Sequence, residues 1–240
     1  MGGLITTHKI DLFEACRDLF DEVDAYAELC GEASCLIRRD GRLQACATDP
    51  ISSARAVDDF YPSPTPIDVL SIGGGGAATA ITVQLMQRHI ARRITVVDRT
   101  PARLARIQSV HRKLDDSADA RYVEAGDPLT IDRLVADLPA GSLVINATGL
   151  GKDIPGSPLT DHVVFPEGAY VWDINYRGDL KLLRQARLQQ EARRLHVEDG
   201  WRYFIHGWAV VIGRVFDLDI DAERTARLAA IAEVERRQER

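Results

Sequence analysis

The sequence lacks several features that would place it in a class at once. No apolar run reaches the roughly eighteen residues that a membrane-spanning helix needs, and the N-terminus (MGGLITTHKIDLF) has no basic stretch followed by an apolar one. No block of basic residues stands out, and 30 Lys and Arg against 36 Asp and Glu give a formal net charge of -6. We therefore expect neither membrane insertion nor non-specific binding to nucleic acid.

Cysteine is also scarce. The four cysteines stand at positions 16, 30, 35 and 46, and no two of them form a C-x-x-C pair. In a chain without an export signal, such cysteines are typical of reduced thiols rather than of a disulfide framework. We therefore expect a cytoplasmic protein, and the sequence gives no reason to expect a metal site.

The overall composition is that of an ordinary globular protein. Hydrophobic residues make up 45% of the 240 residues and charged residues 28%, with a mean hydropathy of -0.15. This balance excludes a wholly disordered chain. The length suits one large domain, or one domain and part of another.

Short apolar runs alternate with helix-like stretches over most of the chain. The clearest run, residues 67–72 (IDVLSI), ends in glycines, which is typical of a buried parallel strand that enters a tight turn. The pattern predicts strands at residues 67–72, 94–98, 122–124, 143–146, 170–174 and 195–197, and helices at 77–90, 101–114, 128–138 and 180–190. Alternation at this spacing predicts an α/β fold with a doubly wound parallel sheet of the Rossmann type.

Residues 1–60 follow a different pattern. We expect a strand at residues 4–6, an amphipathic helix at 11–29, and a hairpin of residues 33–38 and 43–47 that turns at Asp40-Gly41. Residues 61–66 (YPSPTP) carry three prolines and form the clearest linker. The alternating charges of residues 221–240 predict a solvated terminal helix.

A glycine-rich turn joins the first strand of the predicted sheet to its first helix. Gly73, Gly75, Gly76 and Ala77 leave room for a pyrophosphate against the backbone, and the helix N-terminus offers unpaired N–H groups to the phosphates. An acidic residue, Asp98, ends the next strand, as dinucleotide-binding folds require. We favour a bound NAD or NADP over the competing interpretation, a glycine turn without a ligand.

The choice between NAD and NADP stays open. Asp98 would hydrogen-bond the ribose hydroxyls and favour NAD. Arg99, Thr100 and Arg103 could instead hold a 2′-phosphate and favour NADP, or the two arginines could belong to a solvated helix start.

At this point the chain resembles the shikimate/quinate dehydrogenase family. The glycine turn and Asp98-Arg99-Thr100 are similar to the family's cofactor motifs, and residues 145–151 (INATGLG) and 171–176 (VWDINY) resemble two further family segments. The segments at 6–9 (TTHK) and 47–49 (ATD) are similar to those that carry the family's catalytic lysine and its partner aspartate. The resemblance covers residues 3–216 in order, which a chance match of one motif does not do.

The resemblance implies a role for each motif. Asn146, Thr148 and Gly149 would lie along the nicotinamide half of the cofactor. Lys9 and Asp49 would be catalytic: the ammonium acts on the proton of the reacting hydroxyl group, and the carboxylate orients the lysine and keeps it charged. Without the resemblance, Lys9 would be interpreted as a surface residue and Asp49 as a helix cap.

The chain also departs from the family pattern at positions that contact substrate. Ser34 stands where the family has asparagine, Gly207 where it has glutamine, and Ile5 and Ala47 also replace polar residues. Each unpaired substrate group would cost about 1–3 kcal/mol, so we expect unmodified shikimate to be a poor substrate. Tyr176 remains available as a hydrogen-bond donor to substrate, or serves as a structural tyrosine.

The resemblance also implies a domain organisation. The chain starts almost at the lysine segment, so the opening strand and helix of the family are absent. We therefore expect a truncated N-terminal α/β substrate domain, a Rossmann domain, and C-terminal helices that pack back on the substrate domain. Their predicted ranges are 1–60, 61–200 and 201–240.

Two functions compete at this stage. The first is an NAD(P)-dependent oxidoreductase of the shikimate dehydrogenase type, which would act on a secondary alcohol or ketone of a shikimate-like or other hydroxy acid. The second is a non-catalytic dinucleotide-binding protein that has lost its substrate site. The expected partner is a small-molecule substrate, and a homodimer or a second chain that supplies the missing N-terminal segment is possible.

Overall fold

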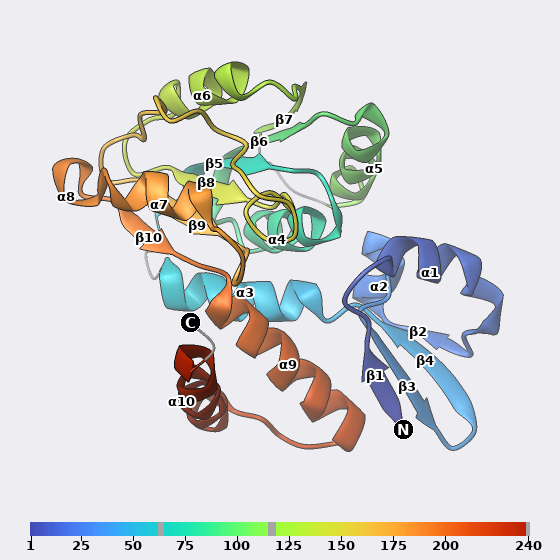
Figure 1. Cartoon of the computed structure of the whole chain (residues 1–240). Coiled ribbons are helices and arrows are strands. Elements are labelled where there is room, and N and C mark those ends of the chain that lie inside the picture. Colours follow the sequence, from blue (N-terminus) through green and yellow to red (C-terminus); the bar gives the residue numbers. More distant parts are fainter. Residues whose placement is uncertain (62–64, 115–118, 239–240) are drawn as a thin grey trace. The chain divides into compact units, whose positions relative to one another are not determined.

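The computed structural model describes residues 1–61, 65–114 and 119–238. It divides the chain into two compact units, which we call the first unit (residues 1–56 and 202–240) and the second unit (residues 57–201) (Figure 1). Residues 62–64 of the predicted proline linker and residues 239–240 of the predicted terminal helix lie outside the described residues. No helix in the described ranges is both long enough and apolar enough to cross a membrane.

The second unit contains a six-stranded sheet in which every neighbouring pair is parallel, in the order β10-β9-β8-β5-β6-β7. The chain runs outward from β5 to β7, returns to β8 on the other side of β5, and runs outward again. The strands are β5 (Ile67–Ile72), β6 (Ala91–Asp98), β7 (Asp119–Glu124), β8 (Leu143–Asn146), β9 (Tyr170–Asp173) and β10 (His196–Glu198). This order confirms the predicted doubly wound sheet and places its topological switch point between β5 and β8.

Helices follow the strands as predicted. They are α4 (Gly76–Gln87), α5 (Pro101–His111), α6 (Pro128–Ala136), α7 (Lys181–Arg187) and α8 (Gln190–Arg193). Side chains alternate between the two faces of a strand, so Leu70 and Ile72 of β5 point to the same face. There they share one core with Ile131 of α6 and Leu182 of α7. All nine residues from Ala78 to Met86 in α4 are buried.

The first unit contains a four-stranded sheet in the order β1-β3-β4-β2. The hairpin of β3 (Cys35–Arg39) and β4 (Arg42–Cys46) confirms the prediction, and Asp40 and Gly41 both have positive φ angles (51° and 81°), as a tight two-residue hairpin turn requires. The other elements are β1 (Gly2–Leu4), α1 (Lys9–Ala15), the 3-10 helix η1 (Arg17–Leu19), β2 (Glu22–Val23), α2 (Ala25–Cys30), α3 (Asp49–Phe60), α9 (Trp201–Phe216) and α10 (Ala222–Gln238). Helices α3 and α9 each cross from one unit to the other.

Two sequence predictions for this unit were wrong. The single helix expected at residues 11–29 is broken into α1, η1, β2 and α2, because Val23 pairs with Ala45 of β4 and Asp24 then caps a new helix. The strand expected at residues 4–6 ends at Leu4, since its pairing with β3 stops where Leu4 meets Cys35.

Asp24 connects three parts of the first unit. Its Oδ1 accepts hydrogen bonds from the amides of Ala27 (2.8 Å) and Ala47 (3.2 Å), and its Oδ2 pairs with Nη1 of Arg214 at 2.8 Å. It therefore caps α2, fixes the end of β4 and binds α9.

We expect Asp24→Ala to lower the free energy of unfolding by about 2–3 kcal/mol, because a helix cap and the partner of a half-buried arginine are lost together. Urea unfolding followed by circular dichroism measures the change. Asp18→Ala, at an exposed position in η1, is the control and should change the value by less than about 0.5 kcal/mol. Equal effects of the two substitutions would contradict the role assigned to Asp24.

Candidate active site

Lys9 and Asp49 form a partly buried ion pair in the first unit. Lys9 is the first residue of α1 and Asp49 is the first residue of α3, so two helix starts bring the side chains together. Nζ of Lys9 donates to Oδ2 of Asp49, and the side chains are only 18% and 11% exposed.

The surroundings of Lys9 keep its amine charged. Burial is the largest single influence and favours the neutral form, but the carboxylates of Asp49 and Glu32 and the hydrogen bond with Asp49 together raise the pKa of Lys9 above its usual value. The ammonium is thus a fixed positive charge and a proton donor at neutral pH. Such a group can stabilise an oxygen atom that gains negative charge during a reaction.

The segment that leads into α3 is held by buried hydroxyl groups. The hydroxyl of Ser34, which is fully buried, accepts a hydrogen bond from the Thr48 amide (2.6 Å) and lies 3.0 Å from the Thr48 hydroxyl. Ser52 donates to the Thr48 and Asp49 carbonyls and also bonds with the hydroxyl of Tyr203 in α9. Ser34 therefore positions the residue next to Asp49. Gly207, the other predicted substrate residue of this unit, lies in α9.

In the second unit, the glycine turn begins where β5 ends. Gly73 has a φ of +106° and its amide donates to the Val97 carbonyl at 2.7 Å; a Cβ there would lie only 2.7 Å from the Ala147 carbonyl oxygen. Only glycine allows the turn after β5 to approach the turn after β8 this closely. Gly75 precedes α4 without a side-chain cap, and Gly76 and Ala77 begin the helix, so its first amides are available to an anion.

Asp98 holds the glycine turn in place. Its Oδ2 accepts from the Gly74 amide and its Oδ1 from the Thr100 amide, both at 2.8 Å, and its side chain is 5% exposed. Arg103 lies beside the turn, with its guanidinium 3.9 Å from Asp98, and Arg99 is exposed. Both oxygens of the carboxylate are therefore engaged by backbone amides, and the guanidinium of Arg103 lies nearby.

The segment after β8 is organised by amide side chains. Oδ1 of Asn146 accepts from the amide (3.1 Å) and the hydroxyl (2.7 Å) of Thr148, and its Nδ2 donates to Oδ1 of Asp173 at 3.0 Å. Asn175 donates to the Leu150 carbonyl at 3.0 Å, which closes the turn around Gly149. The register pairs Asn146 with Asp173, so these groups lie at the carboxyl ends of adjacent strands.

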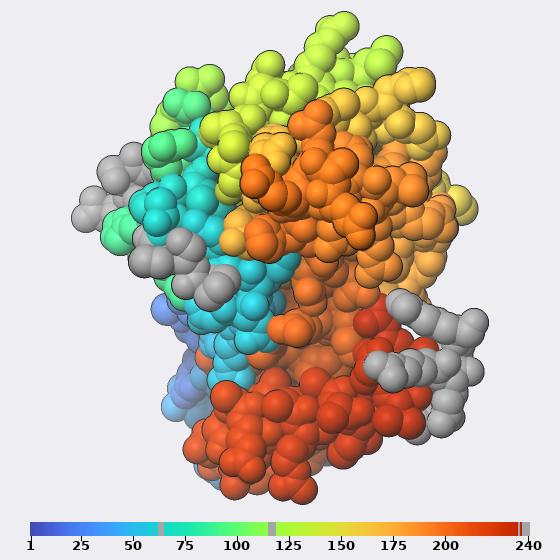
Figure 2. Space-filling model, turned by 90° about the vertical axis from the view of Figure 1, so that its left-hand side faces the viewer, coloured from blue at the N-terminus to red at the C-terminus, as the bar shows by residue number. Residues whose placement is uncertain are grey.

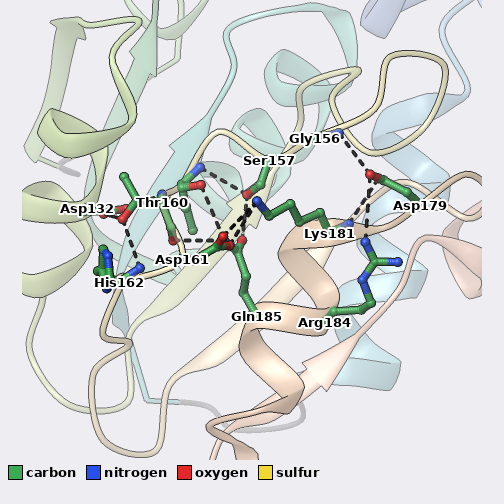
Figure 3. Close-up of polar contacts among 11 residues, drawn as sticks. Asp132, Gly156, Ser157, Thr160, Asp161, His162, Asp179, Lys181, Arg184 and Gln185 are labelled. Atoms are coloured by element: carbon green, nitrogen blue, oxygen red, sulfur yellow. Dashed lines mark hydrogen bonds and ion pairs between the residues drawn. The ribbon is translucent and has the colours of Figure 1, made fainter.

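A further network fixes the rest of this segment against α7. Gln185 donates to the Thr160 carbonyl and accepts from the hydroxyl of Ser157 (2.7 Å), while Asp179 accepts from the Gly156 amide at 3.0 Å (Figure 3). Figure 2 shows the yellow surface of this segment beside the orange surface of α7. Sequence reasoning missed Gln185 and Asp179, because no motif marks them and their role arises only from tertiary contact.

The structure distributes the predicted site residues over both units. Lys9, Asp49 and Ser34 lie near one another in the first unit, together with the unpredicted Glu32. In the second unit, the cofactor residues gather at the carboxyl ends of adjacent strands. Tyr176 also lies in the second unit, where Nζ of Lys152 stands 5.5 Å from its ring centroid.

The strand order and the glycine turn define the second unit as a Rossmann-type fold, a class whose members bind ligands at the switch point of the sheet. The comparisons with known proteins agree with this class. The quinate dehydrogenase of Corynebacterium glutamicum, solved in complex with NAD, superposes with a TM-score of 0.77 at 23% identity, over 95% of this chain and 76% of that protein. No protein-family model matches the chain.

Curated relatives identify the family. The shikimate dehydrogenase (NADP(+)) of Methylocella silvestris is 33% identical over 224 residues, which are 90% of this chain and 71% of that protein. The enzyme of the same name from Streptococcus thermophilus is 31% identical over 171 residues, 71% of this chain. That match spans only 58% of the streptococcal protein. The chain belongs to the shikimate dehydrogenase family, as its motifs predicted.

Asp173 provides a pH-dependent test of the site in the second unit. It is fully buried, and Oδ2 has no hydrogen-bond partner among the described residues. Burial raises its pKa from 3.8 to about 6, against the opposing effect of its bonds with Asn175 and Asn146. Between pH 4 and 6, the folded protein therefore keeps a proton that the unfolded chain releases, and the free energy of unfolding falls as pH rises.

We expect the stability of the wild type, relative to Asp173→Asn, to fall by about 2 kcal/mol between pH 4 and pH 7, because this range covers most of the effect of a shift of about two pKa units. The asparagine amide does not titrate, so its burial changes the free energy of unfolding by the same amount at each pH. Chemical denaturation of both proteins across this pH range measures the difference. A difference that stays constant with pH would show that Asp173 titrates normally.

Proposed function

We propose that the chain is an NADP-linked oxidoreductase, which moves a hydride between the nicotinamide and a secondary alcohol or ketone. The observation that carries the proposal is the buried Lys9–Asp49 pair, in which the amine is kept charged. The names of the curated relatives, shikimate dehydrogenase (NADP(+)), describe the same class of reaction. The glycine turn fits a dinucleotide, since its backbone amides and open surface suit a pyrophosphate.

A nicotinamide bound at the glycine turn would supply the hydride in one direction and accept it in the other. In ketone reduction, Lys9 donates a proton from Nζ to the carbonyl oxygen as that oxygen becomes an alkoxide, so an alcohol forms and the amine is left neutral. In alcohol oxidation, the neutral amine takes the hydroxyl proton. Asp49 orients Nζ throughout and stabilises its charged form.

A dinucleotide-binding protein without catalysis is the less favoured alternative. Removing a lysine and a carboxylate from water costs free energy that a purely structural site recovers more cheaply with apolar side chains. The pair of Lys9 and Asp49 is therefore better explained by proton transfer than by stability alone.

The arrangement around the glycine turn favours NADP over NAD. Both oxygens of Asp98 already accept backbone amides, so this carboxylate has less capacity to bind ribose hydroxyls. Arg103 has its guanidinium 3.9 Å from this carboxylate, and Arg99 is the next residue in the chain. Both arginines are exposed, and guanidinium groups suit the 2′-phosphate of NADP. We also place the enzyme in the cytoplasm, the compartment in which cysteines outside disulfides, as at positions 16, 30, 35 and 46, are kept reduced.

We expect Lys9→Met to lower kcat by about 10²–10⁴-fold, the usual contribution of a general acid, with little change in NADP affinity. Steady-state assays with a panel of hydroxy acids and polyols measure turnover, and calorimetry measures binding. Lys113→Met, at an exposed lysine, is the control. Wild-type rates in the Lys9 variant would remove Lys9 from the mechanism, while NADP binding without any turnover by the wild type would support the non-catalytic alternative.

The cofactor preference has its own test. We expect Arg99→Ala and Arg103→Ala each to weaken NADP binding by about tenfold and to leave NAD binding nearly unchanged, because only NADP carries the phosphate that an arginine binds. Calorimetric titrations with both cofactors measure the ratio. Arg133→Ala, at an exposed site in α6, is the matched control. If either substitution weakens the binding of NADP and of NAD by the same factor, that arginine does not contact the 2′-phosphate.

A further inference from the structure

The turn that follows the predicted nicotinamide segment, residues 146–149, carries a lysine. The amide of Lys152 donates to the Gly149 carbonyl at 3.3 Å. The Leu180 amide donates to the Gly151 carbonyl at 2.9 Å, and a Cβ at Gly178 would lie only 2.4 Å from the carbonyl oxygens of both Gly151 and Lys152. The segment after β9 therefore packs against the backbone of Lys152 and fixes the place of this residue.

The side chain of Lys152 lies against the ring of Tyr176. Its Nζ stands 5.5 Å from the ring centroid, within the range of a cation–π contact, and the side chain is 29% exposed. Lys152 follows β8 and Tyr176 follows β9, and these two strands are adjacent and parallel. Both residues therefore lie at the edge of the sheet that carries the glycine turn, and the ammonium is partly shielded from water without being enclosed.

The charged groups around Lys152 leave an excess of positive charge. Nζ of Lys152 is 3.9 Å from Oδ2 of Asp153, which is long for an ion pair, whereas Nη2 of Arg177 is 2.8 Å from Oδ1 of the same carboxylate. One carboxylate thus faces two cations. Asp153 and Arg177 are 61% and 60% exposed, so water and salt screen their pair. An anion would therefore be stabilised most at Lys152, the less exposed cation.

The position of Lys152 indicates where such an anion comes from. In Rossmann-type folds the dinucleotide crosses the switch point of the sheet, here between β5 and β8, with its pyrophosphate at the glycine turn. A substrate that reacts at the far end of the cofactor would lie near the segment after β8, and Lys152 is only three residues beyond Gly149. A single excess positive charge suits a carboxylate better than a phosphate ester, which carries nearly two negative charges.

We propose that Lys152 is a substrate-binding residue whose ammonium holds a carboxylate of the substrate, so that the enzyme prefers a hydroxy acid to its uncharged analogue. This inference rests on the proposed oxidoreductase function. The ring of Tyr176 positions the ammonium, and the backbone contacts of Gly178 keep the turn from moving away.

The test compares each acid of the panel, with shikimate and quinate among them, with its primary carboxamide. With NADP, we expect the wild type to have at least tenfold higher kcat/KM for the acid. Lys152→Met removes the charge and should raise KM for the acid at least tenfold, the usual worth of a charge-assisted hydrogen bond. It should change kcat, KM for the amide and NADP affinity little, and Lys152→Arg should largely retain the preference.

Lys181→Met is the matched control. Lys181 also lies in the second unit and also pairs with an exposed aspartate, Asp161, at 3.0 Å. We expect this variant to keep the wild-type preference for the acid, because the substitution removes a positive charge away from the turn after β8.

The outcomes separate the two proposals. If the wild type turns over no member of the panel, the oxidoreductase function fails, and the binding measurement below decides the role of Lys152. If the wild type turns over only uncharged compounds or prefers the amides, only the role of Lys152 fails. The same holds if Lys152→Met binds NADP normally and keeps the preference for the acid.

The binding measurement does not depend on turnover. The chain has four lysines, at positions 9, 113, 152 and 181, so in an NMR spectrum of lysine labelled with ¹³C at Cε the Lys152 signal is the one that Lys152→Arg removes. With NADP present, we expect the panel acids to shift this signal saturably and their carboxamides to leave it in place, while the Lys113 signal stays constant. If no acid moves the Lys152 signal, Lys152 does not bind the carboxylate.

Discussion

The ion pair between Lys9 and Asp49 is the interaction on which the first unit's chemistry depends. A buried ammonium is costly unless it is paired, and the pair joins the first residues of α1 and α3. The local structure supports that requirement, since Ser34 binds the amide next to Asp49 and Ala33 binds the carbonyl of Lys9. These two bonds thus help to hold the first turns of α1 and α3 in place.

The two units balance buried negative charge in different ways. In the second unit, Asp98 is stabilised by backbone amides of the glycine turn, and Asp173 by amide groups of Asn146 and Asn175. In the first unit, Asp49 is instead paired with the ammonium of Lys9. Backbone dipoles give a rigid turn that suits a phosphate, whereas a mobile proton on an amine suits acid–base chemistry.

The sequence specified the second unit far better than the first. The bounds of β5 and β8 were predicted to the residue, because strands buried along their whole length are mainly apolar and end here at a glycine or polar turn. The helix expected at residues 11–29 was wrong because its helical periodicity competes with two tertiary contacts: Val23 pairs with β4, and Asp24 binds Arg214, 190 residues away in the sequence. The local spacing of apolar residues carries no information about a contact partner so distant in the sequence.

The same limit applies to the candidate site. Lys9 and Asp49 were predicted because short motifs carry them, and the structure shows their side chains in contact, while their catalytic role stays a prediction. Glu32 belongs to no such motif, and an isolated glutamate in a sequence is usually a solvated surface residue. Its burial follows from the hydrogen bonds that hold its turn against α1 and α2. A buried residue that no motif marks, such as Glu32, therefore becomes visible only in the fold.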